Sequence, residues 1–238
     1  MREEPDPAVL YPEVAQKGSL AAALQALAAG QGMSLTMDVT VSNPLRHATA
    51  PSVLSHREAL RVSAWVFERR WRVCGFANNG IVVSGVTDDV NDVPAIVHAW
   101  AQGATLDEID RAAGFDVLTG RFEVPDGNAA DVIASEWQYM LKEARQADWA
   151  EYQALVEAAY AEPKLRELYP YTSHWALGFS ETLHPFTPSV VTLVASRGGD
   201  YTIKEWWNGP ALAVVSTAAE AISIAVGRLS KNPGPPTG

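Results

Sequence analysis

The segment with the densest polar and aromatic side chains is Tyr169–Trp175, Tyr-Pro-Tyr-Thr-Ser-His-Trp. His174 could act as a general base, because imidazole titrates near neutrality without perturbation. Tyr171 and Trp175 would then line a substrate site. The alternative is structural: His174 and Trp175 anchor the start of a strand, one hydrogen-bonded and one packed, while Tyr171–Ser173 make turn contacts only. The residue types leave both interpretations open.

Glu136 is the second candidate for proton transfer, because it is the acid inside a strongly apolar run of a predicted helix beside Trp137. Burial would raise the pKa of its carboxyl group and make it a candidate acid or base alongside His174. The alternative is that Glu136 lies at the boundary between that helix and solvent.

Trp206 and Trp207 fall on the last predicted hairpin. Alternation along a strand puts neighbouring side chains on opposite faces of a sheet, so one ring is expected in the core. The other ring is either an exposed aromatic at the strand edge or a wall of a binding site. The pattern does not say which of the two is buried.

No sequence motif of a named chemistry accompanies these residues. Glycine-rich nucleotide loops, the serine-hydrolase elbow and the zinc-protease His-Glu-x-x-His pattern are absent. Cys74, the single cysteine, is expected to be an inert strand residue, and Asp88–Asp89 is expected to begin a helix. We therefore expect no cofactor and no metal.

The elements that must position these residues occur twice along the chain. Trp71 corresponds to Tyr201 and Thr87 to Thr217, each 130 residues later, with an Asn-Gly pair between them in both copies. The helices that follow carry matching apolar stripes: Val93, Ile96, Val97 and Trp100 in the first copy, and Ile222, Ala225, Val226 and Leu229 in the second.

The repeat predicts an α+β fold of two related helix/antiparallel-sheet/helix halves around a pseudo-twofold axis, with residues 60–100 superimposing on 190–229. A Ser19-capped helix opens the first half, and a strand from His174 to Phe179 opens the second sheet. The predicted regions are an N-terminal extension (1–15), a first α+β half (16–116), a helical connection (117–150), a second α+β half (151–230) and a disordered tail (231–238).

Composition limits the partners. The 238 residues include 28 acidic and 18 basic side chains, for a net charge of −10. This balance argues against nucleic acid and against anionic lipid as partners. The basic run Arg69–Arg72 is expected at a hairpin tip. The acidic, proline-rich start is unlike a signal peptide, and the longest apolar stretch is interrupted by polar residues, so we expect a cytoplasmic protein.

Three runs of sequence carry a family resemblance: Val83–Asp89, Ala99–Glu108 and Leu168–Trp175. Together they resemble a family of uncharacterised actinomycete proteins grouped under natural-product biosynthesis, over roughly residues 10 to 229. The resemblance carries no catalytic residues. It implies a cytoplasmic accessory or tailoring protein of a secondary-metabolite pathway.

Two functions are compatible with these observations. The first is a cofactor-independent protein that cyclises or otherwise tailors an intermediate, with His174 and Glu136 as catalytic residues. The second is a non-catalytic module that binds a peptide or carrier-bound intermediate for a partner enzyme. In either case the site is expected where the two halves meet, and its walls are Tyr171, His174, Trp175 and one of Trp206 or Trp207. The sequence does not indicate the oligomeric state.

Overall fold

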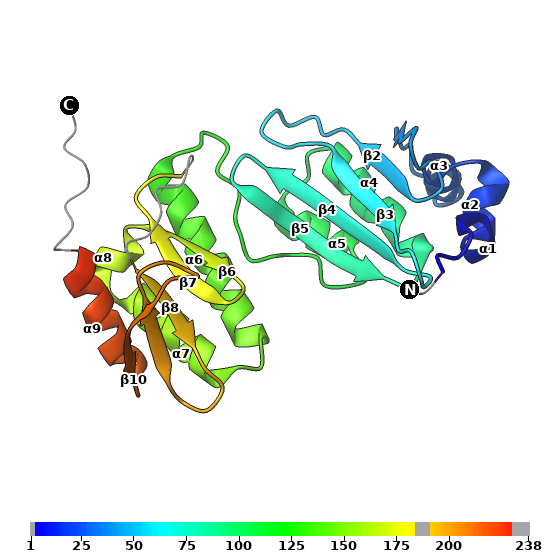
Figure 1. Ribbon diagram of the computed structural model, residues 1–238. Helices are drawn as coiled ribbons and strands as arrows, with labels where there is room; N and C mark the ends of the chain where they lie inside the picture. Colours follow the sequence, from blue (N-terminus) through cyan, green and yellow to red (C-terminus); the bar gives the residue numbers. More distant parts are fainter. Residues whose placement is uncertain (1–2, 184–190, 230–238) are drawn as a thin grey trace. The chain divides into compact units, whose positions relative to one another are not determined.

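The computed structural model describes residues 3–183 and 191–229. The chain divides into two compact units, an N-terminal unit of residues 1–126 and a C-terminal unit of residues 127–238 (Figure 1). Within the described residues each unit contains a five-stranded antiparallel sheet together with helices. The predicted α+β class with antiparallel sheets is therefore confirmed. A pseudo-twofold axis between the units stays a prediction.

The N-terminal unit begins with short helices, continues with an antiparallel sheet in the order β1-β2-β3-β4-β5, and closes with further helices. Its elements are α1 (Pro7–Leu10), α2 (Pro12–Lys17), α3 (Leu20–Gly30), β1 (Asp38–Val39), β2 (His47–Ala50), β3 (Leu60–Ala64), β4 (Trp71–Ala77), β5 (Gly80–Thr87), the 3-10 helix η1 (Val90–Asp92), α4 (Val93–Ala101) and α5 (Leu106–Ala112).

Local signals in the sequence explain where these helices begin. The Ser19 hydroxyl accepts a hydrogen bond from the Ala22 amide at 3.1 Å and caps α3. Thr105 and Glu108 form a complete capping box at the start of α5. On α4, the predicted apolar stripe of Val93, Ile96, Val97 and Trp100 is completely buried.

The C-terminal unit has the same order of element types: helices, five antiparallel strands in sequence order, and a final helix. Its elements are α6 (Ala129–Gln146), α7 (Ala150–Ala161), α8 (Pro163–Arg166), β6 (Tyr169–Ser173), β7 (Ala176–Ser180), β8 (Thr192–Ala195), β9 (Tyr201–Lys204), β10 (Ala211–Val215) and α9 (Ala218–Leu229). Helix α6, within the predicted connection, contacts α7 and β6 of this unit.

Strand pairing around Trp71 and Tyr201 follows the repeat seen in the sequence. Trp71 opens β4 and pairs with Ala64 and Thr87 on its two neighbours. Tyr201 opens β9 and has partners at the matching places on β8 and β10. Both aromatic side chains are buried. The hairpins of the two copies are thus built alike at their starts.

Several local predictions are corrected by the structure. The β4–β5 turn consists of Asn78 and Asn79, because Ala77 already pairs with Gly80; the predicted Asn-Gly turn is thus one residue too late. Val226 and Leu229 on α9 are only partly buried, in contrast to the prediction. The predicted tail, 231–238, lies outside the described residues.

None of the helices in residues 3–183 and 191–229 is both long and apolar enough to cross a bilayer.

Candidate functional site

The tip of the β6–β7 hairpin holds the two most prominent predicted site residues. Ser173 pairs with Ala176, so His174 and Trp175 alone form the turn. Their φ angles are 51° and 65°, in the left-handed region that glycine and asparagine favour at such turns. The predicted strand from His174 to Phe179 is therefore confirmed over residues 176–179, where it is β7, but its start is wrong: His174 and Trp175 form the turn that reverses the chain between β6 and β7.

Trp175 rests on two aromatic residues at the start of α7. Its ring lies edge-on to Tyr152, with centroids 5.2 Å apart at 89°, and 6.0 Å from the ring of Trp149. Trp175 is nevertheless 45% exposed. One side of the indole is thus supported by the protein while the remainder is available to a ligand.

His174 stacks on Trp207, with ring centroids 5.0 Å apart and planes 17° from parallel. The Ser173 hydroxyl lies 3.2 Å from His174 Nδ1, at hydrogen-bonding distance. His174 is exposed. We call Trp149, Tyr152, His174, Trp175 and Trp207 the tip cluster.

Trp206 and Trp207 depart from the predicted alternation. They are 49% and 48% exposed, so neither ring belongs to the core. The physical reason is that β9 ends at Lys204, before the pair, and the chain then enters a turn closed by a hydrogen bond from the Gly209 amide to the Trp206 carbonyl at 2.9 Å. Only a continuing strand imposes alternation.

Two polar atoms of the tip cluster are buried without a hydrogen-bond partner in the described part of the chain: Trp149 Nε1 and Tyr152 Oη. Burial raises the pKa of Tyr152 far above its ordinary value, and the nearby Glu143 and Tyr139 raise it further. Tyr152 is therefore a neutral hydroxyl at physiological pH and a hydrogen-bond donor. Both atoms lie beneath the surface of the cluster, so the groups that the cluster offers to a ligand are its exposed rings.

A cation lies at the edge of the tip cluster. The Arg197 guanidinium is 5.2 Å from the centroid of the Trp149 ring, within the range of a cation–π contact. The adjacent Gly198 amide donates to Glu151 Oε1 at 3.2 Å, which ties the β8–β9 turn to α7. The hydrogen bonds from its own backbone amide and from Gly198 lower the pKa of Glu151.

Two further predicted residues, Tyr171 and Glu136, lie outside the turn. Tyr171 pairs with Gly178 across the hairpin and covers it with its ring. Glu136 is buried on α6, only 7% exposed, so the solvent-boundary interpretation is wrong. Its catalytic pairing with His174 stays a prediction.

Sequence reasoning did not identify Trp149, Tyr152 or Glu143. Glu143 is the carboxylate whose charge acts on Tyr152, and it accepts a hydrogen bond from the Tyr139 hydroxyl at 2.8 Å. The four-residue spacing of Tyr139 and Glu143 on a predicted helix was an available signal. The spacing of Trp149 and Tyr152, which places both rings on one helix face, was another.

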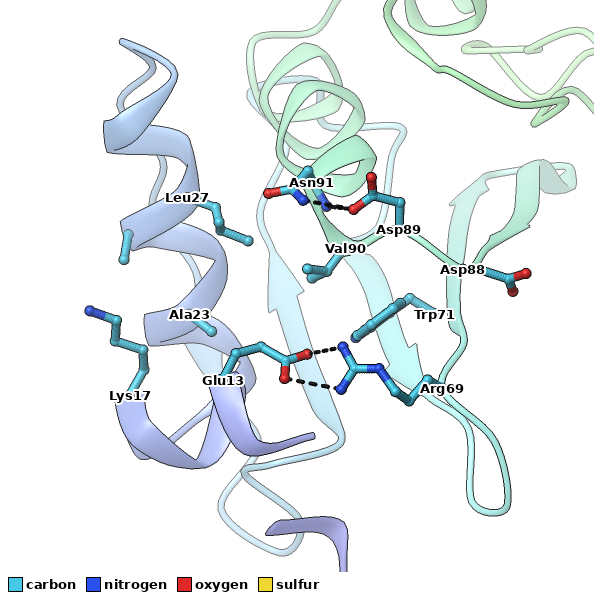
Figure 2. Close-up of a pocket in the computed structure, with 11 residues that line it drawn as sticks. Glu13, Lys17, Ala23, Leu27, Arg69, Trp71, Asp88, Asp89, Val90 and Asn91 are labelled. Atoms are coloured by element: carbon cyan, nitrogen blue, oxygen red, sulfur yellow. Dashed lines mark hydrogen bonds and ion pairs between the residues drawn. The ribbon is translucent and has the colours of Figure 1, made fainter. Parts of the chain in front are cut away.

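A concave region lies in the N-terminal unit, where α2 and α3 face the start of β4 (Figure 2). It is an open cleft of about 610 Å³, and we call it the α3 cleft. Its lining residues are Glu13, Lys17, Ala23, Ala26, Leu27, Arg69, Trp71, Asp88, Asp89, Val90 and Asn91.

Asp89 and Cys74, the other residues considered in the sequence, have structural roles. Asp89 caps η1 by accepting hydrogen bonds from the backbone and side chain of Asn91, which confirms the predicted helix start. Cys74 is half-buried on β4, and burial raises the pKa of its thiol. Among the residues that the structure describes, no group of three histidine, cysteine or carboxylate side chains is arranged to hold a metal ion.

Comparison with known proteins gives one match. Residues 131–237, less than half of the chain, match the model of a family of unknown function, DUF6193. This range begins within α6 and includes the whole tip cluster. Neither the curated proteins nor the solved structures contain a match.

Proposed function

We propose that the protein is a cytoplasmic accessory protein of a bacterial natural-product pathway, and that its tip cluster binds an aromatic or other apolar part of a pathway intermediate. The observation that carries this proposal is the pair of half-exposed Trp175 and Trp207 rings, each held by a ring contact within the tip cluster. Such a surface offers rigid apolar contact area.

Backbone strain at the tip supports a functional role. A non-glycine residue in the left-handed region raises the free energy of the folded state. Such residues recur at ligand sites, where the side chain is needed despite the backbone strain. His174 and Trp175 both adopt it, and Asp148, next to Trp149, has φ 47°. An Asn-Gly pair at the tip would relieve the backbone but would remove both rings that face solvent.

A binding role fits the geometry better than catalysis. A binding role needs no acid beside His174, and Glu143, the carboxylate near Tyr152, already accepts a hydrogen bond from the Tyr139 hydroxyl. The exposed tip suits recognition of an intermediate, free or attached to a carrier or a partner enzyme. The proposed association with natural-product biosynthesis follows from the resemblance in Val83–Asp89, Ala99–Glu108 and Leu168–Trp175.

Cofactor-independent tailoring is the second candidate function, and one observation favours it. The Ser173 hydroxyl lies 3.2 Å from His174 Nδ1, so the pair could move a proton on a bound intermediate. In this case Ser173→Ala would lower product formation without weakening binding. In the binding role, Ser173→Ala has no effect because Ser173 is not part of the tip cluster.

The test replaces the native gene in a producing host and compares metabolites by mass spectrometry. We expect the deletion strain and the Trp207→Ala strain to lose or reduce the same metabolite, because the stack on His174 is broken. Trp206→Ala is the matched control: its exposure equals that of Trp207, but the His174 stack involves Trp207. Melting temperatures of the purified variants separate lost binding from lost folding.

Two results would contradict the proposal. An unchanged metabolite profile in the deletion strain would remove the pathway role. Equal losses in the Trp206→Ala and Trp207→Ala strains, with unchanged melting temperatures, would show that the His174–Trp207 stack is not the binding element.

A further inference from the structure

β5 and β10 each form one edge of a sheet, in the N-terminal and the C-terminal unit respectively (Figure 1). A strand at a sheet edge presents a row of backbone N–H and C=O groups along its outer side, and these groups can pair with a further strand. The two edge strands follow similar hairpins but differ in what lies along that outer side. This difference indicates what the edge of β10 lacks.

The edge of β5 is covered by residues 117–121. The Ser84 amide donates a hydrogen bond to the Val117 carbonyl at 2.7 Å, and the Thr119 amide donates to the Val82 carbonyl at 3.3 Å. An isolated antiparallel bridge lies between these two hydrogen bonds. An extended segment of the same chain thus takes the place of a further strand.

The edge of β10 has no such cover among the described residues. In residues 3–183 and 191–229, no backbone group of Ala211–Val215 forms a backbone hydrogen bond with a segment other than β9. The Val214 side chain is 61% exposed. The outer side of β10 is therefore open to another strand.

β10 has the same irregularity as β5. Each strand has one extra residue in its pairing with the preceding strand, Val82 in β5 and Leu212 in β10. These two residues are 130 positions apart, which is the spacing of the sequence repeat. Counted from them, Val214 occupies the position of Ser84, whose amide bonds the covering segment. A bulge can hinder pairing at an edge, but β5 is covered despite its bulge.

Each position of β10 is also more exposed than its counterpart in β5. Positions that are buried in β5 are partly buried in β10, and positions that are partly buried in β5 are exposed in β10. The compared pairs are Ile81 and Ala211, Val82 and Leu212, Val83 and Ala213, Ser84 and Val214, and Gly85 and Val215. A strand along the outer side of β10 would bury these residues to the extent seen in β5.

The chain around β10 carries no charge. Residues 206–219 contain no acidic or basic side chain, although the whole chain has a net charge of −10. Proteins commonly protect a free edge with charged residues, and β10 has none. Two copies of an acidic chain repel each other over most of their surfaces, so a neutral apolar edge is where they can approach without that cost. A second copy of the chain therefore fits this edge better than a charged partner does.

We propose that β10 pairs with β10 of a second copy of the chain, so that two C-terminal sheets join into one antiparallel sheet of ten strands, five from each copy. Every side chain of Ala211–Val215 is apolar, so each residue faces an apolar residue of the other copy wherever the two strands overlap. The proposal does not depend on the binding role of the tip cluster.

Antiparallel pairing of two identical strands closes by symmetry. A twofold axis perpendicular to the sheet relates the copies, so each β10 uses its one free side and no third copy can add there. The same axis puts both copies of α9, which contacts β9 and β10, on one face of the joined sheet. A pair of five-residue strands makes a small interface, so the dimer should be weak and its formation should depend on protein concentration.

Sedimentation velocity of the full chain over a range of concentrations tests the pairing. We expect a monomer–dimer equilibrium for the wild type. Val214→Lys, at an exposed position of the edge, should raise the dissociation constant of the dimer by roughly tenfold or more, because it places like charges across the joined strands. Val86→Lys is the matched control and should leave the constant unchanged: Val86 is also exposed, but it lies on β5, whose edge is already covered.

Hydrogen exchange measured by mass spectrometry locates the interface. In the wild type, the amides of Ala211–Val215 should exchange more slowly as the protein concentration rises, whereas those of Gly80–Thr87 should exchange at the same rate at every concentration. Melting temperatures are compared at a concentration at which wild type and Val214→Lys are both monomers. Equal values there would show that the variant loses the dimer and not the fold.

Three results would overturn the proposal. The first is a wild-type chain that stays monomeric up to about 1 mM, a concentration at which even a weak specific pair should form. The second is a dimer that Val214→Lys leaves intact, that both lysine variants weaken equally, or whose formation does not slow exchange at β10. The third is exchange at β10 that is as slow in the monomer as exchange at β5, because another segment of the same chain would then cover the edge.

Discussion

The two units share an order of elements but differ in how completely they are packed. In the N-terminal unit β4 and β5 are seven and eight residues long, and the apolar stripe of α4 is fully buried. In the C-terminal unit β9 and β10 have four and five residues, and α9 buries its stripe only as far as Ala225. Short strands cover less of a helix, so the same pattern produces a shallower core.

Polar ends of aromatic side chains show a second difference. Trp100 Nε1 donates to the Glu58 carbonyl, and Tyr11 Oη lies 2.8 Å from the carbonyls of Trp65 and Glu68. In the tip cluster, Trp149 and Tyr152 have buried polar atoms without such partners. The difference does not separate the two units as wholes, because Trp71 Nε1 in the N-terminal core also lacks a partner among the described residues, and Trp137 Nε1 in the C-terminal unit donates to the Arg166 carbonyl.

The largest expected effect comes from a comparison of helices α4 and α9, which follow the sheets of the two units. Val97→Asp should destabilise the protein by about 4 kcal/mol, because it buries an unpaired charge at a completely buried position. Val226→Asp, at the corresponding position of α9, should cost about 1 kcal/mol because that side chain is partly exposed. Urea unfolding measures both. Equal losses would show that the two helices are packed equally well.

The second comparison concerns glycines beneath aromatic rings. A Cβ at Gly75 would lie 2.7 Å from the ring of Trp100, and a Cβ at Gly178 would lie 2.5 Å from that of Tyr171. Trp100 is fully buried and hydrogen-bonded, whereas Tyr171 is partly exposed and can shift. We expect Gly75→Ala to cost about 3 kcal/mol and Gly178→Ala about 1 kcal/mol in thermal unfolding. A larger loss for Gly178→Ala would reverse this ranking.

These differences show which features the sequence could predict. Short-range signals were reliable: the Ser19 cap, the Thr105–Glu108 box and the buried stripe on α4 each depend on neighbouring residues. The α+β class also followed from repeated local patterns. The exposure of Trp207 and Val226 depends on the lengths of β9 and β10. Those lengths depend on where strand pairing stops, and no local sequence pattern predicts that position.

The candidate sites were predictable only in part. The polar and aromatic composition of Tyr169–Trp175 singled out the β6–β7 hairpin. The turn at His174 and Trp175 violates the usual turn preference, so the predicted strand began at His174 and not at Ala176. Trp149 and Trp71 reach their sites through contacts between distant segments. The α3 cleft is lined by residues of α2, α3 and the β5–η1 turn. These segments are distant in the sequence, so no residue spacing predicts that they meet.

The third prediction compares two buried tyrosines, one in each unit: Tyr11 and Tyr201. Tyr11→Phe should destabilise the protein by about 2 kcal/mol. The substitution removes the hydroxyl group that hydrogen-bonds the Trp65 and Glu68 carbonyls of the β3–β4 turn. Tyr201→Phe should change stability by less than about 0.5 kcal/mol, since its hydroxyl makes no hydrogen bond with the residues described. Differential scanning calorimetry distinguishes the two, and equal effects would contradict the anchoring role of Tyr11.

The smallest effect is the pH dependence of two carboxylates that tie a turn to a helix. The hydrogen bonds from Arg69 lower the pKa of Glu13 below its ordinary value of 4.5. A carboxylate with a lowered pKa in the folded state stabilises the fold above its unfolded pKa, and this contribution disappears as the pH falls through the folded pKa. The Glu13 and Arg69 side chains are 37% and 46% exposed, so screening limits the contribution to about 0.5 kcal/mol.

Glu13→Gln should therefore lower stability at pH 7, and the difference from wild type should vanish on acidification below 4.5. The matched variant is Glu151→Gln, because the pKa of Glu151 is lowered by amides and not chiefly by a cation. Salt screens ion pairs more than hydrogen bonds, so about 1 M NaCl should diminish the effect at Glu13 and leave that at Glu151. Urea unfolding of the wild type and both variants, at pH 7 and pH 3 and with and without salt, measures these differences in stability. A Glu13 effect that persists at pH 3 would mean that the Arg69 ion pair does not stabilise the N-terminal unit.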